Sequence, residues 1–355
     1  MNAIEESTEL LERWFELLAS EPALRSRNAA LRLGVSEGQL VAARCGDGAT
    51  RLVEDYQRLL GSLEPLSEVL VITRNEHVVH EKRGFYRKLE FNNSYGAALD
   101  PNIDLRFNFR HWAHGFAVNE DGARGPRKSL QFFDRDGTSV HKIYQTNNTS
   151  DTAWRDLIGG FAHADQAPGL TPMPAVTDYT VEPREQADAA ALRKDWLALE
   201  DVHAFQALLR RYRLRRIDAL HLVGTDQARP VASDTWRAVL QCAADIAMPI
   251  MVFVASPGVV QIHTGPIQKL VPRDGWFNVL DPTFNLHLRE EAIAQCWVVH
   301  KPTSDGGVNS VELYGRAGEL IVQLFGARKP GIPELKGWRA LLAEIPATDA
   351  VLDAV

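Results

Sequence analysis

A histidine near the middle of the chain and three cations are the side chains whose type and setting best suit ligand binding. His203 lies in the segment LEDVHAFQALLRRYRL, where apolar residues recur at helical spacing. We predict a helix that starts near Asp188 and continues, with or without a break, through this segment, and the spacing puts His203 beside Leu199 and Ala207. A neutral imidazole is a normal axial ligand for haem iron. A single histidine on a helix is also typical of a hydrogen-bonded core or surface residue, and both interpretations stay open at this point.

The cations have two interpretations each. Arg106 belongs to a predicted strand (DLRFNF), where an inward-facing arginine needs a carboxylate or another anion as partner. It either pairs with Asp104 or Asp100, or hydrogen bonds, directly or through water, to a distal ligand on iron. Lys301 (HKPTSDGG) and Arg328 (LFGARKPG) flank the last predicted strands. They either bind haem propionates at a pocket rim or are solvated loop charges.

Aromatic residues offer a surface for a flat ligand, and other chemistries find little support. Trp196, Phe205 and Phe253 would suit a planar macrocycle. The sequence contains no Gly-rich phosphate-binding loop, no HExxH motif and no GxSxG motif. His111 and His114 are three positions apart, with no nearby Cys or Glu to complete a metal site.

Composition limits the class of protein. The 355 residues are 45% hydrophobic and 24% charged, a normal globular balance, and the length suits two domains. The net charge of −7 disfavours nucleic-acid binding, which requires a basic surface. The acidic amino terminus lacks signal-peptide features, and the apolar stretch Met248–Val260 is too short to cross a membrane. The three cysteines are far apart in the sequence, which is typical of reduced thiols in a cytosol. We therefore expect a cytoplasmic protein without membrane insertion.

Helices are predicted first along the chain, followed by short strands. Residues 8–19 have a helical apolar face, and residues 27–43 predict two helices broken at Gly34, with Ser36 as N-cap. This segment also fits a helix-turn-helix, but without a basic excess a helical cap on a sheet is favoured. Antiparallel strands are predicted from the segments EVLVITRN, HVVHEKRG, FYRKLEF, IDLRFNF, GFAVNE, KSLQFFDRDG and TSVHKIYQ.

The second half of the sequence repeats the first. Residues 70–145 match residues 181 positions later without a gap, for example Leu99-Asp100-Pro101 with Leu280-Asp281-Pro282. A tandem duplication explains this constant offset. We predict an α+β fold in which each half is a helical cap plus a large antiparallel sheet. The expected domains are residues 1–165 and 188–355, joined by a linker over 166–187 that is rich in proline and alanine.

Matched positions that differ in chemistry indicate that the halves have different roles. Arg106 corresponds to His287, Glu120 to Lys301, and Tyr144 to Phe325. Because Glu120 would repel a carboxylate where Lys301 attracts one, we expect only the second half to hold a propionate.

Several longer segments together resemble the HemS/ChuS/PhuS family of bacterial haem-uptake systems, over nearly the whole chain. They are TRNEHVVHE, LDPNIDLRF, SLQFFDRDG, YQTNNTS followed by AW, DVHAF, MVFV, VQIHTG, GWFNVLDPTFNLHL and HKPTSDGG. The internal duplication is also a feature of that family.

The resemblance implies one haem b per chain, bound in the C-terminal half. It implies His203 as the axial ligand of the iron and Arg106 as a distal residue. The other haem-binding residues that it implies are Phe253, Lys301, Gln323, Phe325 and Arg328. Phe325 departs from the family, which usually has a tyrosine there, so one polar contact is lost or replaced.

The resemblance leaves three functions open. The protein either carries haem from an inner-membrane permease to a separate haem oxygenase, or degrades haem itself to release iron, with Arg106 as catalytic residue. No flavin or nicotinamide fingerprint is visible, so electrons for degradation would come from a reductase or another external donor. The third possible function, a haem-responsive regulator, is supported only by the predicted helices at the amino terminus.

Overall fold

The computed structural model describes residues 3–122, 125–177, 179–304, 306–329 and 331–348. It contains two compact units. The first comprises Met1–Arg74, Glu81–Val176 and Ala255–Gln261, and the second comprises Asn75–His80, Thr177–Val254 and Ile262–Val355. The units thus follow the two sequence repeats except for two short segments, which correspond to each other at the 181-residue offset.

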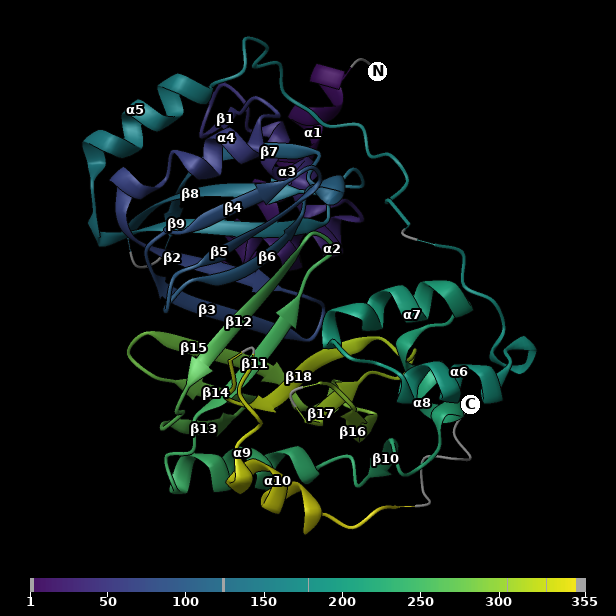
Figure 1. Ribbon diagram of the computed structural model, residues 1–355. Helices are drawn as coiled ribbons and strands as arrows, with labels where there is room; N and C mark the ends of the chain where they lie inside the picture. Colours follow the sequence, from purple (N-terminus) through teal and green to yellow (C-terminus); the bar gives the residue numbers. More distant parts are fainter. Residues whose placement is uncertain (1–2, 123–124, 178, 305, 330, 349–355) are drawn as a thin grey trace. The chain divides into compact units, whose positions relative to one another are not determined.

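Helices and strands occur in the same order in both repeats (Figure 1). The elements of the first repeat are α1 (Ala3–Ser20), α2 (Ser26–Leu33), α3 (Glu37–Ala43), β1 (Ala49–Arg51), α4 (Tyr56–Gly61), β2 (Ser67–Arg74), β3 (Val78–Gly84), β4 (Leu89–Asn92), β5 (Tyr95–Leu99), β6 (Asp104–Asn108), β7 (His114–Gly122), β8 (Gly125–Phe133), β9 (Ser139–Thr149) and α5 (Asp151–Phe161). Those of the second are α6 (Ala189–Leu197), η4 (Val202–Ala204), α7 (Phe205–Tyr212), α8 (Arg216–Val223), β10 (Ala228–Val231), α9 (Thr235–Asp245), β11 (Ile250–Ala255), β12 (Val259–Gly265), β13 (Leu270–Arg273), β14 (Trp276–Leu280), β15 (Phe284–Arg289), β16 (Gln295–Lys301), β17 (Val308–Tyr314), β18 (Leu320–Gly326) and α10 (Lys336–Ala343).

The strands form two nine-stranded antiparallel sheets with equivalent strand orders. One is β1-β7-β8-β9-β2-β3-β15-β14-β13, and the other is β10-β16-β17-β18-β11-β12-β6-β5-β4. Each order becomes the other when every strand is replaced by its counterpart in the second copy. The predicted α+β fold with a tandem duplication is therefore confirmed.

Local sequence signals explain where several elements end. Gly34 adopts φ 72° after α2, a left-handed conformation that glycine accepts readily, and it separates α2 from α3 as predicted. Ser36 caps α3 in a capping box with Gln39. The predicted strand FYRKLEF is wrong for its first half, because Lys88 at φ 51° interrupts the extended chain and β4 begins at Leu89.

The predicted helix through His203 is also divided. Helix α6 ends at Leu197, Asp201 is extended (φ −137°, ψ 131°), and His203 lies in the short 3-10 turn η4 before α7 begins at Phe205. His203 therefore does not share a continuous helical face with Leu199.

In the second unit, helices cover both faces of strands β16, β17 and β18 (Figure 1). Cys296 and Val298 pack with α9 and α10, whereas the alternate residues Trp297 and Val299 pack with α6, α7 and α8. This alternation follows from the two-residue period of a strand. The face towards α6–α8 carries the candidate site.

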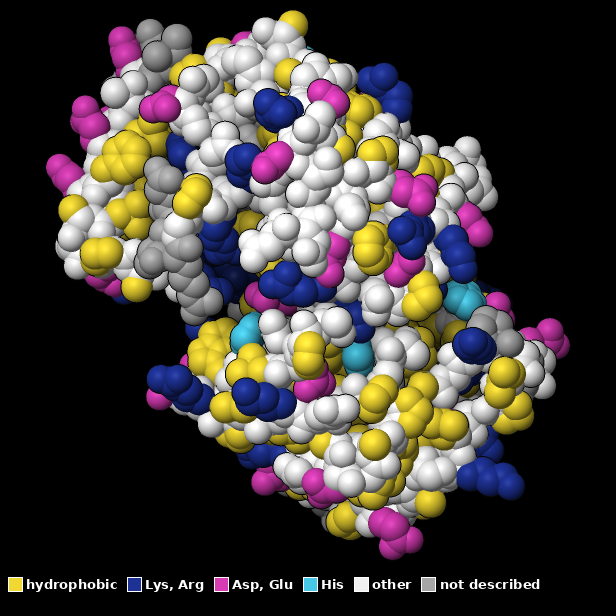
Figure 2. Space-filling model, turned by 90° about the vertical axis from the view of Figure 1, so that its left-hand side faces the viewer, with side chains coloured by type: hydrophobic (Ala, Val, Ile, Leu, Met, Phe, Trp, Pro, Cys, Tyr) yellow, Lys and Arg dark blue, Asp and Glu magenta, His cyan; other side chains and the backbone are white. Residues whose placement is uncertain are grey.

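The exterior is mixed in charge on the face drawn in Figure 2, where acidic and basic side chains are both scattered among hydrophobic ones. Among the described residues, no helix combines the length and the hydrophobicity needed to span a membrane.

Candidate functional site

The turn that carries His203 is fixed by an aspartate two residues earlier. Asp201 accepts a hydrogen bond from the backbone N–H of His203 (2.9 Å), and its Oδ1 lies 2.7 Å from Nδ1 of the His203 ring. The His203 side chain is 78% exposed. Because Nδ1 is held by the carboxylate, Nε2 is the nitrogen available to an incoming ligand. This is the arrangement in which proteins orient a metal-binding imidazole.

The charge around this turn favours an ionised aspartate. The hydrogen bond from the backbone N–H of His203 lowers the pKa of Asp201, and the positive charge of Arg328 contributes in the same direction. Arg328, which follows β18, is thereby placed near the histidine turn. A carboxylate that stays ionised strengthens the imidazole as a donor to a metal.

The loop after β16 lies against the same turn. Ser304 donates two hydrogen bonds to the carbonyl of Glu200, from its backbone N–H (3.0 Å) and from its hydroxyl (3.2 Å). The predicted segments LEDVHAF and HKPTSDGG therefore meet in space.

Five of the candidate residues lie on the sheet face that carries α6–α8 or directly after its strands, and they are Phe253, Lys301, Gln323, Phe325 and Arg328. Phe253 on β11 and Phe325 on β18 contact each other with ring centroids 4.9 Å apart, and Gln323 is paired with Phe253 across the strands. All three are half-buried. The two rings offer an apolar patch suited to a flat ligand.

A buried carboxylate organises the polar part of this face. Glu312 on β17 is 0% exposed and accepts hydrogen bonds from Arg216 (2.7 and 2.5 Å) and Lys301 (3.3 Å). It also accepts from three further donors, which are Ser310 (2.8 Å), Tyr314 (2.6 Å) and Gln323 (3.0 Å). We call these six residues the Glu312 cluster. It links the first residue of α8 to three neighbouring strands.

The cluster holds two cations for one carboxylate. Burial would raise the pKa of Glu312, but Arg216 and Lys301 hold it well below its usual value. Burial lowers the pKa of Lys301 to about 8, although Glu312 opposes this effect. Both cations also lie 4.7 Å from the Phe205 ring, two residues from His203. The face is therefore electropositive next to the histidine turn.

Lys301 and Arg106 differ from their expected environments. Lys301 is only 4% exposed and paired with Glu312, so it is neither a solvated loop charge nor a rim residue, because α6–α8 cover its strand. Arg106 belongs to the first unit, is exposed rather than inward-facing, and forms an ion pair with Asp104, as one of its two interpretations expected. The roles of both residues towards a ligand remain predictions.

The first unit has the opposite arrangement of charge at the corresponding face. Glu37, the first residue of α3, forms a buried ion pair with Lys142 (2.6 Å), where the second unit has Arg216 and Gln323. Gln131 replaces Glu312. Burial would raise the pKa of Glu37, but Lys142 keeps it lowered. This unit therefore buries one balanced pair in place of an excess of cations.

Sequence reasoning missed Asp201 and Glu312, and it interpreted the basic run 210–216, which ends at Arg216, as a solvated helix face or a site for an acidic partner, whereas Arg216 is paired with buried Glu312. The spacing of Asp201 before His203 is a signal for a cap, and the alternation VNSVELY places Glu312 on the face opposite Val311 and Leu313. Neither signal shows which face is covered, so neither reveals that the carboxylate is buried.

Comparison with known proteins places the chain in a family. Residues 34–161 and 213–345 match the family model described as "Haemin-degrading HemS.ChuX domain". The chain belongs to this HemS/ChuX family. The two matched segments lie in the two repeats, in agreement with the duplication.

Curated members of the HemS/ChuX family match over nearly their whole length. The hemin transport protein HmuS of Yersinia pestis is 39% identical, covering 95% of this chain and 97% of its own. The hemin transport protein HemS of Yersinia enterocolitica is 38% identical, covering 97% of this chain and 99% of its own.

Two solved structures are also similar to this chain over nearly its whole length. Holo-PhuS, a heme-binding protein from Pseudomonas aeruginosa, superposes with a TM-score of 0.93 at 43% identity, covering 96% of this chain and 99% of that one. ChuS, described as an E. coli heme oxygenase, superposes with a TM-score of 0.87 at 39% identity, covering 95% of this chain and 99% of that one.

Proposed function

We propose that this protein binds one haem b through His203 and serves in haem transport. The observation that carries the proposal is the exposed imidazole fixed by Asp201 beside an aromatic and electropositive sheet face. Among the described residues no group of three or more His, Cys, Asp or Glu side chains could hold a bare metal ion. Haem needs only one protein ligand for its iron, so the donor set fits haem.

The residues of the second unit have distinct tasks in this proposal. His203 ligates the iron through Nε2, Asp201 orients the ring, and Phe253 and Phe325 contact the macrocycle. Arg328 favours the propionates by charge, and the excess positive charge of the Glu312 cluster, which includes Lys301 and Gln323, adds to this attraction. Bound haem supplies the redox and oxygen chemistry of its iron, and the protein fixes the ligand and the polarity around it.

The decisive experiment is a haem titration followed by absorption spectroscopy. Wild type should bind one equivalent with a histidine-ligated Soret band. The His203→Ala variant should bind more weakly or with an altered band, whereas His163→Ala, which removes another exposed histidine, should behave as wild type. Unchanged affinity and spectrum in His203→Ala, or two haems per chain, would rule out the assignment.

Haem degradation is a second candidate function, favoured by the relative described as a heme oxygenase. In this proposal Arg106 would be the distal residue of the bound haem, which would supply the oxygen chemistry, and an external reductase would supply electrons. Ascorbate, or NADPH with a reductase, is added to the complex with and without catalase. Bleaching that survives catalase supports directed oxygenation, whereas bleaching abolished by catalase reflects peroxide in solution and leaves the carrier role.

The transport role implies partners of defined chemistry. We propose a cytoplasmic protein that receives haem from an inner-membrane permease and, as a pure chaperone, delivers it to a separate haem oxygenase. The three cysteines are free thiols, which is compatible with a reducing compartment. Fractionation of cells and capture of the permease with the haem-loaded chain test this assignment.

A further inference from the structure

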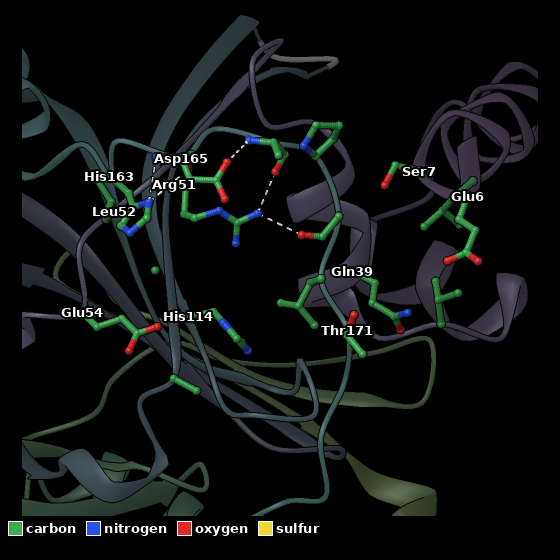
Figure 3. A pocket seen from close by; sticks show the side chains of 18 of the residues that line it. Glu6, Ser7, Gln39, Arg51, Leu52, Glu54, His114, His163, Asp165 and Thr171 are labelled. Atoms are coloured by element: carbon green, nitrogen blue, oxygen red, sulfur yellow. Dashed lines mark hydrogen bonds between the residues drawn. The ribbon is translucent and has the colours of Figure 1, made fainter. Parts of the chain in front are cut away.

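The first unit contains a cavity of about 690 Å³ that takes no part in the proposed haem site. Its wall is formed by α1, α3, the ends of β1 and β7, and the segment 163–171 (Figure 3). All of these lining residues lie within the first unit. Cavities of this size typically hold a small organic molecule.

A fixed arginine lines this cavity without a carboxylate partner. Arg51, the last residue of β1, donates from Nη2 to the carbonyls of Ala167 and Gly169, both at 2.9 Å. The side-chain amide of Gln166 bonds both the backbone N–H and the carbonyl of Arg51 (2.8 and 3.0 Å). The two Nη2 bonds fix the guanidinium, which also faces the Phe116 ring at 5.3 Å, and the Gln166 bonds fix the backbone of Arg51.

The charge of Arg51 is left for another partner. No described carboxylate forms an ion pair with Arg51, and its buried Nε has no hydrogen-bond partner. Arg51 as a whole is only half-buried, but a buried donor such as its Nε is normally paired, so this arrangement is unusual for a purely structural arginine. Figure 3 shows the guanidinium directed into the cavity.

A second unpartnered donor lines the same cavity. Tyr56 is only 5% exposed, and its hydroxyl has no hydrogen-bond partner. Burial raises the pKa of Tyr56, so the phenol stays protonated, and burial lowers the pKa of His114, so the imidazole stays neutral near pH 7. The His114 ring points into the cavity (Figure 3). One cation and two neutral polar rings thus face a potential ligand.

Acidic side chains on the remaining wall restrict the ligand's charge. Glu54 and Asp165 lie on the side of Arg51, and Glu6 lies across the cavity (Figure 3). A dianion such as phosphate would be repelled by these carboxylates. A single carboxylate beside Arg51, combined with a cationic nitrogen towards the acids, matches both signs.

We propose that this cavity binds a small zwitterionic carboxylate, of the class of short peptides, with Arg51 holding the carboxylate and Tyr56 donating to it. The segment 165–169 forms the wall at the ligand's anionic end, because its carbonyls and the Gln166 amide are bonded to Arg51. The proposal does not depend on haem binding.

The test uses the full-length haem-free chain and three matched probes in isothermal titration calorimetry. Tri-L-alanine has both charges, its C-terminal amide lacks the carboxylate, and its N-acetyl form lacks the ammonium group. Tri-L-alanine should bind saturably at one site. The amide should bind at least about tenfold more weakly, because it loses a charge-assisted bond to Arg51, and the acetyl form should bind more weakly by a smaller factor.

Variants of the chain provide the second arm. Arg51→Gln should weaken tri-L-alanine at least about tenfold, whereas Arg83→Gln, an exposed arginine outside the cavity, should not. Tyr56→Phe should weaken binding severalfold without lowering the thermal midpoint of the free protein, because its hydroxyl has no bond to lose.

Three results would overturn the proposal: no saturable binding of tri-L-alanine by wild type at about 10 mM, equal binding of its amide, or unchanged binding in Arg51→Gln. If Arg51→Gln fails to fold, the probe series on wild type and the Tyr56→Phe variant still decide. Haem titration of Tyr56→Phe should match wild type, which separates this proposal from the haem site.

Discussion

Replacement of Glu312 by glutamine should destabilise the second unit strongly. The wild-type carboxylate is completely buried and accepts hydrogen bonds from five side chains, two of them cationic. A glutamine amide has a similar shape but no charge, and its NH₂ group would face donors. The variant would therefore leave Arg216 and Lys301 buried without a counter-charge.

The expected loss is about 3–5 kcal/mol in the free energy of unfolding, the usual cost of removing one partner of a buried ion pair. Glu319→Gln is the matched control, because its carboxylate is 42% exposed and paired with His77. Exposed pairs contribute at most about 1 kcal/mol, so the control should lose little. Much of the stability should return when Glu312, Arg216 and Lys301 are all replaced by apolar residues of similar size.

Urea unfolding followed by circular dichroism measures the loss, and amide hydrogen exchange localises it. Exchange should accelerate in β17 and β18, whereas β8 and β9 of the first unit should be protected as in wild type. A loss in Glu312→Gln no larger than that in Glu319→Gln would refute the reasoning, since it would mean that the buried charges are neutralised in another way.

Further predictions concern the histidine turn, the buried lysine and the distal arginine. Asp201→Asn keeps the cap of the turn but removes the charge, so haem affinity should fall by about tenfold and the reduction potential of bound haem should rise, as measured by spectrophotometric titration. In folded protein the pKa of Lys301 is about 8, below its usual value of 10.5. As pH rises, the folded state therefore loses this proton at a lower pH than the unfolded state does. The free energy of unfolding, measured with urea, should therefore rise between pH 8 and 9, and it should rise less steeply with pH in Lys301→Met. Arg106→Ala should change the rate of haem bleaching more than the haem dissociation constant, because axial coordination and burial of the macrocycle dominate binding, whereas Arg106 would contribute a single hydrogen bond. A folded variant that no longer binds haem would contradict this.

The repeat and its strands were predictable because they depend on local signals. The break at Gly34 and the cap at Ser36 each involve residues a few positions apart. The constant offset of 181 residues predicted two equivalent sets of strands, and the equivalent orders of the two sheets agree.

The environments of single polar residues were less predictable because they depend on what covers them. The sequence around Lys301 predicted a cation at a pocket rim or in a solvated loop, since nothing local shows that α6–α8 cover the end of β16. The turn at His203 was assigned to a helix because its apolar spacing is helical, whereas the hydrogen bonds of Asp201 stabilise a different conformation.

The opposite charges of the two units constrain how the halves could have diverged after duplication. Helix α3 begins with Glu37, which pairs with Lys142, whereas α8 begins with Arg216, which pairs with Glu312. Replacing Glu37 or Lys142 in the first unit, or Glu312 in the second, leaves a buried charge without a partner, at a cost comparable to much of a domain's stability. The intermediates between the two patterns must therefore have been stabilised elsewhere or have changed two residues together. The same barrier now opposes reversion, so the specialisation of the halves is locked in by their cores and not only by selection on a ligand.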